Sequence, residues 1–125
     1  MKRTAKPTEH QEQVALFAWA NVMSARYPEL KLMFAIPNQS GGGVPAIIRG
    51  RRMVKEGVRA GVPDLLLPVP SGNFHGLFIE LKRHGGQMKE NQLWWATALR
   101  AQGYDVAVCY GFEEARVAIE RYLMK

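Results

Sequence analysis

The sequence has a single cysteine, few histidines and no long apolar run. Cys109, alone among 125 residues, excludes an intrachain disulfide and a cysteine-based zinc site. The apolar runs are much shorter than the roughly 18 residues that a membrane span needs, and no apolar stretch of the secretory kind follows the basic start. We therefore expect a protein of a reducing, cytoplasmic compartment with no membrane partner.

Acidic residues are also scarce beside basic ones. Seventeen Lys and Arg oppose 11 Asp and Glu, which gives a formal net charge of +6. A basic chain of this size favours a polyanionic partner. Hydrophobic residues make up 47%, enough for one folded core, so we expect a single domain over residues 1–125 with residues 1–7 flexible.

The pattern of apolar residues and chain breakers predicts an α/β fold, a mixed central sheet flanked by helices. Helical spacing and a capping box at Thr8 predict the first helix. The expected helices are 9–26, 45–57, 89–101 and 112–123. Apolar runs bounded by turn residues predict the strands 30–36, 64–69, 76–82 and 104–110. A helix between the last two strands favours a parallel crossover.

Two carboxylates and a lysine are expected to converge in this sheet. Asp64 opens one strand, and Glu80 and Lys82 lie near the end of the next. If these strands form a hairpin, the two ends meet, and a spacing of two places Glu80 and Lys82 on one face. Carboxylate oxygens of this kind suit Mg²⁺ or Mn²⁺. The alternative is a surface ion pair, which strands as apolar as these disfavour.

The sequence Pro63-Asp64 followed by Glu80-Leu81-Lys82 resembles the PD-(D/E)XK nuclease superfamily. That resemblance implies a restriction-endonuclease-like core with the order αβββαβ. Much of the chain further resembles the VRR-NUC branch, the virus-type replication-repair nuclease domain, in its short stand-alone members from phages. The matching stretches are residues 8–13, 34–38, 55–57, 60–65, 79–82, Gln92 with Trp95, and 103–104.

The resemblance also implies further residues around the metal. Glu9 corresponds to the acidic residue of the first helix, which would reach the metal directly or through water. Gln13 lies at i+4 on the same helical face and would support it. Glu12 lies off that face, and a purely helix-capping role for Glu9 stays open. The carbonyl of Leu81 would add a ligand.

On the helix that follows, Gln92 resembles the family's glutamine and would contact Lys82, the attacking water or a phosphate. Trp95 would pack beneath the site. The implied catalytic set is therefore Glu9, Asp64, Glu80, Lys82 and Gln92. Lys82 would position or deprotonate water, or offset transition-state charge.

A basic segment precedes Asp64 and is expected to contact phosphates, although a solvated face is the alternative. Its members are Arg49, Arg51, Arg52, Lys55 and Arg59. Arg52, Lys55 and Arg59 would share a helical stripe if the helix extends that far. Asn38, at the start of a glycine-rich loop, is expected to approach DNA closely.

We therefore predict a metal-dependent, structure-selective DNA endonuclease that cuts branched DNA such as four-way junctions. Two alternatives are a non-catalytic nucleic-acid-binding module on the same fold and a monomeric flap or single-strand nuclease. Stand-alone members that this chain resembles are dimeric and junction-directed, which implies a symmetric homodimer in a bacterial or phage-infected cell. Candidate contacts are Tyr122, Leu123 and whichever of Trp94 and Trp95 is exposed.

Overall fold

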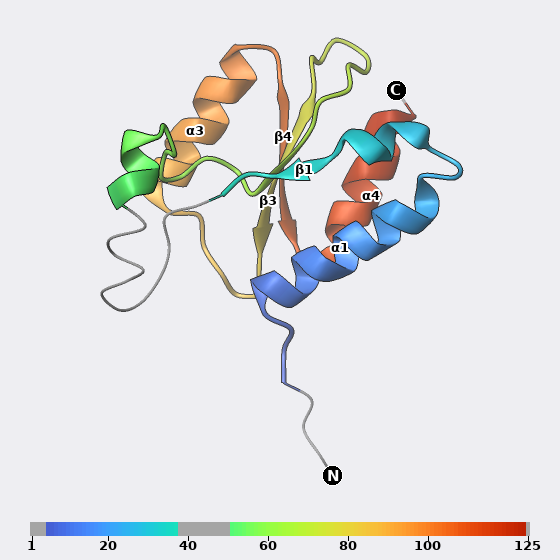
Figure 1. Cartoon of the computed structure of the whole chain (residues 1–125), viewed down its shortest axis with the longest axis horizontal. Coiled ribbons are helices and arrows are strands. Elements are labelled where there is room, and N and C mark those ends of the chain that lie inside the picture. Colours follow the sequence, from blue (N-terminus) through green and yellow to red (C-terminus); the bar gives the residue numbers. More distant parts are fainter. Residues whose placement is uncertain (1–4, 38–50, 125) are drawn as a thin grey trace.

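The computed structural model describes residues 5–37 and 51–124. The expectations for Asn38 and Arg49, and for a helix start at Pro45, lie outside these residues. The elements are α1 (Glu9–Met23), a 3-10 helix η1 (Pro28–Leu32), β1 (Phe34–Ala35), a helix described over 51–55, β2 (Leu65–Leu67), β3 (Leu77–Lys82), α3 (Glu90–Ala101), β4 (Asp105–Tyr110) and α4 (Phe112–Leu123) (Figure 1).

One mixed sheet holds the four strands in the order β1-β2-β3-β4. β1 and β2 are antiparallel, as are β2 and β3, so the expected hairpin is confirmed. β3 and β4 are parallel, because α3 carries the chain back to the starting edge between them. The predicted α/β fold with a mixed, helix-flanked sheet is confirmed.

Helices cover the two faces of the sheet unequally. In Figure 1, α3 lies on one side of β3 and β4, and α1 and α4 lie on the other. Alternation along β3 explains the division: Ile79 and Leu81 pack with α1 and α4, and Phe78 packs with Ala96 of α3. Because both faces are covered, all six residues of β3 are buried. Glu80 and Lys82 therefore lie under the α3 side, on the same face as Phe78.

Several of the expected elements have different bounds. The strand expected at 30–36 is wrong for its first half, because Pro28 begins a 3-10 helix in which Leu30 turns into the core. The paired strand β1 covers Phe34 and Ala35 alone. The first helix ends at Met23 rather than at residue 26, although the predicted capping box of Thr8 and Gln11 is present. The strand expected at 64–69 covers only Leu65–Leu67, and it ends before Pro68, which has no N–H to donate to a neighbouring strand.

The expected basic stripe is also shorter than predicted. The helix ends at Lys55, because Gly57 adopts a left-handed conformation (φ +100°) and the Val58 N–H bonds back to the Met53 carbonyl. Arg59 therefore lies beyond the helix and does not continue the stripe of Arg52 and Lys55. Within residues 5–37 and 51–124, no helix has the length and apolar character to cross a membrane.

Candidate active site

The antiparallel pairing of β2 and β3 brings Asp64 and Glu80 together. Leu65 pairs with Ile79, and continuing that register places Asp64 opposite Glu80. The Asp64 carbonyl accepts the Ile36 N–H at 2.8 Å, so the backbone of Asp64 faces β1 and not β3. Asp64 and Glu80 thus form a non-hydrogen-bonded pair, the kind in which opposite side chains lie closest. The two carboxyl groups are hydrogen-bonded to each other.

Proline at position 63 leaves a backbone carbonyl open beside this pair. The Leu81 N–H donates to Asp64 Oδ2 at 2.6 Å. In a strand the N–H and C=O of one residue point to the same side, so the Leu81 carbonyl also faces the Asp64 edge. Pro63, the residue opposite in the continued register, has no N–H to offer it. The carboxyl groups of Asp64 and Glu80 and the carbonyl of Leu81 therefore lie close together, where the start of β2 meets the end of β3.

The carboxyl pair is buried, and burial controls its charge. Glu80 is 3% exposed and Lys82 6%. Removal from water, reinforced by the hydrogen bond and the charge of Asp64, raises the pKa of Glu80 to about 9, while Lys82 opposes the rise. The Lys82 ammonium lies 3.9 Å from Glu80 Oε2. Burial and Asp64 therefore favour the protonated form of Glu80 in the metal-free protein.

Gln92 holds Lys82 in place from the start of α3. Its Oε1 accepts the Lys82 Nζ at 2.8 Å and the Lys89 N–H, also at 2.8 Å. One amide oxygen thus caps the helix and fixes the lysine. Lys89 is the N-cap residue, and the bond from its N–H to Gln92, three residues on, is the one that a glutamine or glutamate makes in a capping box.

The whole implied catalytic set lines one cavity of about 430 Å³, called here the site cavity. Its walls include Glu9, Asp64, Glu80, Lys82 and Gln92. Glu9 is exposed, and its negative charge adds to the rise in the Glu80 pKa, so it faces the pair across this space. A second cavity, the side cavity, is lined by Gln13 and shares Glu9 and Asp64 with the first.

Glu12, the competing residue of the first helix, has a different contact. Its carboxylate accepts the N–H of Phe112 at the start of α4. A carboxylate is favourable at a helix N-terminus, and here it ties α1 to α4. Glu12 is therefore engaged by α4 and does not line the site cavity or the side cavity.

Sequence reasoning missed the loop over 60–62 and the residues that flank Gln92. Ala60, Gly61, Lys89 and Asn91 all line the site cavity. Trp95, which is half-buried, donates its indole N–H to the Ala60 carbonyl at 3.1 Å and so secures the loop that leads to Asp64. Gly61 lies so close to Asn91 that a Cβ would be 2.9 Å from its backbone. A lysine and an asparagine around Gln92 at a helix start were the available signal.

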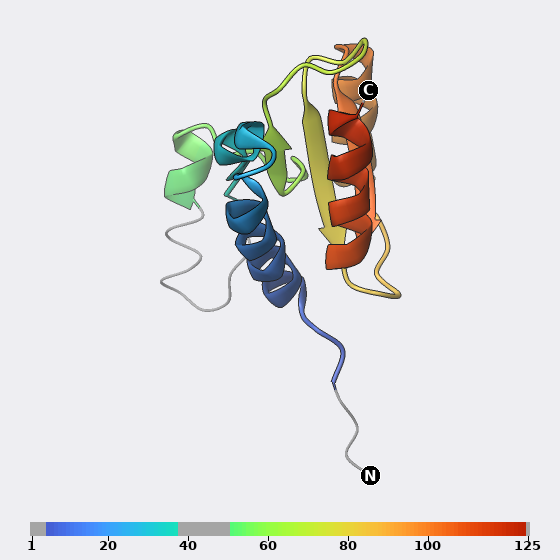
Figure 2. The same ribbon diagram turned by 90° about the vertical axis from the view of Figure 1, so that its right-hand side faces the viewer.

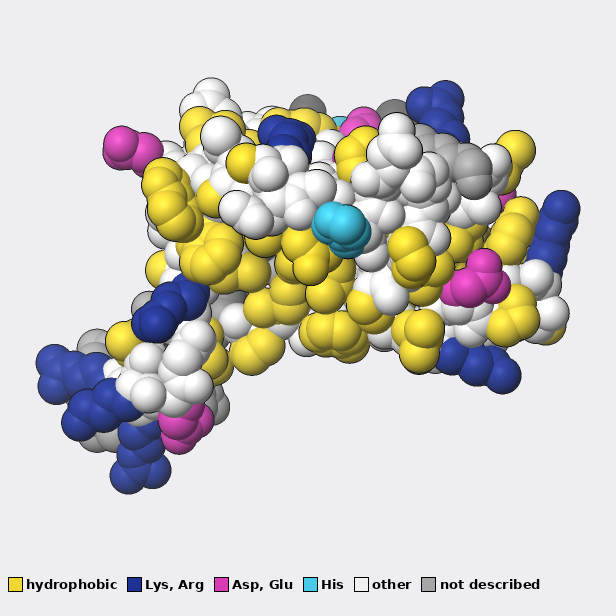
Figure 3. Space-filling model, turned by 90° about the horizontal axis from the view of Figure 1, so that it is seen from above, with side chains coloured by type: hydrophobic (Ala, Val, Ile, Leu, Met, Phe, Trp, Pro, Cys, Tyr) yellow, Lys and Arg dark blue, Asp and Glu magenta, His cyan; other side chains and the backbone are white. Residues whose placement is uncertain are grey.

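The described residues of the predicted basic segment are all exposed. Arg51, Arg52 and Lys55 lie on the 51–55 helix, and Arg59 lies on the turn after it. Figure 3 shows Lys and Arg gathered on a lobe that stands away from the main body. Trp94 is 64% exposed, whereas Tyr122 is 1% exposed and packs in the core. Tyr122 is therefore wrong as a candidate interface residue.

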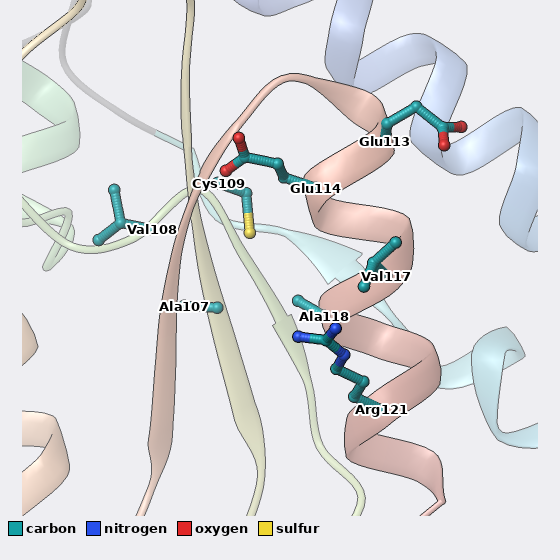
Figure 4. Close-up of a pocket in the computed structure, with 8 residues that line it drawn as sticks. All are labelled: Ala107, Val108, Cys109, Glu113, Glu114, Val117, Ala118 and Arg121. Atoms are coloured by element: carbon teal, nitrogen blue, oxygen red, sulfur yellow. The ribbon is translucent and has the colours of Figure 1, made fainter.

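Another hollow, between β4 and α4, carries no comparable chemistry. In Figure 4 its acidic side chains, Glu113 and Glu114, lie at one end of α4, and Cys109 points toward that helix. Glu114 accepts the Tyr110 N–H at 3.0 Å, and Glu113 pairs with Arg116 at 2.9 Å. Burial, and to a smaller extent Glu114, raises the pKa of Cys109 to about 12, so its thiol is unreactive.

The donor set of the site cavity suits a hard cation that keeps much of its water. Within residues 5–37 and 51–124, no group of three or more His, Cys, Asp or Glu side chains is placed to hold a metal ion. Mg²⁺ commonly binds through one or two carboxylates with water completing its shell, which Asp64, Glu80 and the Leu81 carbonyl allow.

The chain was compared with known proteins. A search of curated proteins finds no match. A solved structure named "VRR_NUC domain protein" has a TM-score of 0.80 and 24% identity, over 96% of this chain and 91% of that one. At this identity the likeness shows the shared fold. The VRR-NUC domain model matches residues 7–113, which is most of the chain. The chain therefore belongs to the VRR-NUC domain family, a family of nuclease-type domains.

Proposed function

We propose that this chain is a Mg²⁺- or Mn²⁺-dependent endonuclease that hydrolyses phosphodiester bonds in branched DNA, four-way junctions included, as a symmetric homodimer. The observation that supports it most is the contact between the Asp64 and Glu80 carboxyl groups, with the buried Lys82 ammonium 3.9 Å from Glu80. A nucleic-acid-binding module has no need of two acidic groups facing phosphate, because they repel it.

In this proposal Asp64, Glu80 and the Leu81 carbonyl hold the metal, and Glu9 reaches it directly or through water. The metal, when bound, lowers the pKa of a coordinated water and stabilises negative charge on the scissile phosphate. Lys82, fixed by Gln92, orients the attacking water or offsets negative charge as the phosphorus becomes pentacoordinate in the transition state. Burial of Lys82 strengthens that electrostatic effect, since little water screens it.

The dimer supplies the symmetry that a four-way junction requires. One chain offers one carboxyl pair, whereas resolving a junction needs two cuts on opposed strands. The outer face of α3 is the candidate interface, because Leu93 (53% exposed) and Trp94 (64% exposed) lie side by side in the sequence there. Arg52 and Lys55 on the protruding lobe would contact phosphates of the duplex arms.

The test is a nicking assay on a mobile four-way junction with Mn²⁺, Mg²⁺ or EDTA, with wild type beside Asp64→Asn, Glu80→Gln and Lys82→Ala. We expect cleavage only with metal, and its near loss in all three variants while DNA binding survives. If the wild-type protein binds DNA but cuts it under none of these metal conditions, the nuclease proposal is refuted and the chain is a nucleic-acid-binding module. Light scattering measures the dimer, and a monomer that cuts a flap better than a junction would refute the junction and dimer parts.

A further inference from the structure

The outward face of α1 carries an apolar groove that the proposed chemistry leaves unused. The groove has a volume of about 470 Å³, and its walls on α1 are His10, Gln13, Val14, Phe17, Ala18 and Asn21. The solvent-facing side of a surface helix is normally polar. Here Val14 is 55% exposed and Phe17 is only partly covered by the core. The α1 groove, as we call it, thus presents apolar surface where water would otherwise lie.

The α1 groove is continuous with the carboxyl pair. It shares His10, Gln13 and Ala35 with the side cavity. The side cavity in turn shares Glu9 and Asp64 with the site cavity. A strand whose phosphate lies at Asp64 can therefore extend directly into the groove.

The two sides of this path differ in chemistry. In Figure 1, the 51–55 helix lies on the α3 side and α1 on the other, with β1 between them, and in Figure 2 both helices lie to the left of β3, toward the β1 edge of the sheet. The 51–55 helix presents Arg51, Arg52 and Lys55, whereas α1 presents apolar side chains with an imidazole and two amides among them. A single-stranded nucleotide has the same division, since its phosphate is charged and its base has apolar faces and polar edges.

Resting on the proposed nuclease function, we propose that the α1 groove receives unpaired bases of the DNA strand being cut, next to the scissile phosphate. Phe17 and Val14 contact the base faces. Gln13 and Asn21 hydrogen-bond to base edges, as amide side chains do in nucleic-acid complexes. The substrate is therefore branched DNA, a four-way junction included, in which the bases beside the cut are unpaired when the protein holds it, and not a linear duplex.

The test measures binding in EDTA, where no cleavage interferes, with branched DNA that carries a short run of unpaired 2-aminopurine nucleotides at the branch point. Val14→Glu disrupts the groove, and Val22→Glu is the matched control, because Val22 is 75% exposed on the same helix and outside the groove. A neutral variant, Phe17→Leu, removes the aromatic ring while keeping an apolar side chain. The same DNA with abasic sites in place of the unpaired bases isolates the base contacts.

We expect wild type to quench the 2-aminopurine fluorescence and Phe17→Leu to reduce that quenching. Val14→Glu should weaken binding about fivefold or more, the loss of one base-stacking contact, while Val22→Glu leaves it unchanged. The abasic DNA should bind wild type and Val14→Glu alike. Equal losses on intact and abasic DNA would overturn the inference, as would a Val14→Glu chain that changes from dimer to monomer in light scattering. Intact groove binding without cleavage in Mn²⁺ would instead refute the proposed function.

Discussion

Replacing Glu80 by Gln should stabilise the metal-free protein relative to wild type, by a free energy of unfolding that grows as the pH rises, although the change removes a proposed catalytic group. The Glu80 carboxyl is buried against Asp64, and burial raises its pKa to about 9. In the unfolded chain a glutamate has a pKa of about 4.3, the value found in model peptides. Between these values the folded chain keeps a proton that the unfolded chain has lost, so stability falls as the pH rises through the window. Gln is isosteric, does not titrate and can still donate to Asp64.

The size of the effect follows from proton linkage. Inside the window one retained proton changes the free energy of unfolding by up to about 1.4 kcal/mol per pH unit. From pH 6 to pH 8 wild type should therefore lose about 2–3 kcal/mol relative to Glu80→Gln. That loss is a large part of the stability of a small domain, which is about 5–15 kcal/mol. In urea it moves the wild-type midpoint by about 1 M or more relative to the variant.

The assay is urea unfolding in EDTA at pH 6, 7 and 8, followed by tryptophan fluorescence. Glu90→Gln is the control, because Glu90 is an exposed glutamate on α3 and its carboxyl is solvated in both folded and unfolded chains. The three histidines are common to all variants and cancel in the comparison. If the stability profiles of wild type and Glu80→Gln run parallel from pH 6 to 8, Glu80 does not hold a proton in the folded chain and the argument from burial fails.

Three further predictions concern the DNA contacts, Lys82 and the loop before Asp64. Replacing Arg52 and Lys55 by Ala should lower the slope of log affinity against log salt by about two units, one for each phosphate contact. Lys31→Ala, at an exposed lysine of the 3-10 helix, should leave the slope unchanged. Gln92→Leu should reduce kcat by freeing Lys82, and should lower the free energy of unfolding by about 1 kcal/mol because the Lys89 N–H at the start of α3 loses its acceptor. Gln92→Glu keeps an acceptor and should restore most of the stability. Equal kcat in wild type and both variants would remove Gln92 from the site. Gly61→Ala should lower the urea midpoint more than Gly85→Ala, because both glycines have positive φ but only at Gly61 does a Cβ meet Asn91 at 2.9 Å; equal effects would mean that the loop can shift.

Local sequence determined the elements and the pairing of the acidic residues. The capping box at Thr8, the turn between β2 and β3 and the spacing of Glu80 and Lys82 are set by neighbours in the chain. Side chains alternate along a strand, so Glu80 and Lys82 share one face of the sheet. A hairpin between the strands then brings both of them close to Asp64. The end of the 51–55 helix is also set by local sequence, because Gly57 adopts the left-handed conformation that ends a helix.

Tertiary structure decided what depends on residues distant in the sequence. That Glu12 binds the N-terminus of α4 while Glu9 faces the carboxyl pair depends on how α1 docks, which helical spacing alone does not specify. Tyr122 is buried and Trp94 is exposed for the same reason: periodicity defines the faces of a helix, and packing chooses which face is covered. Residues 30–32 form a 3-10 turn rather than a strand because burying Leu30 outweighed the weak preference of a short apolar run for extended structure.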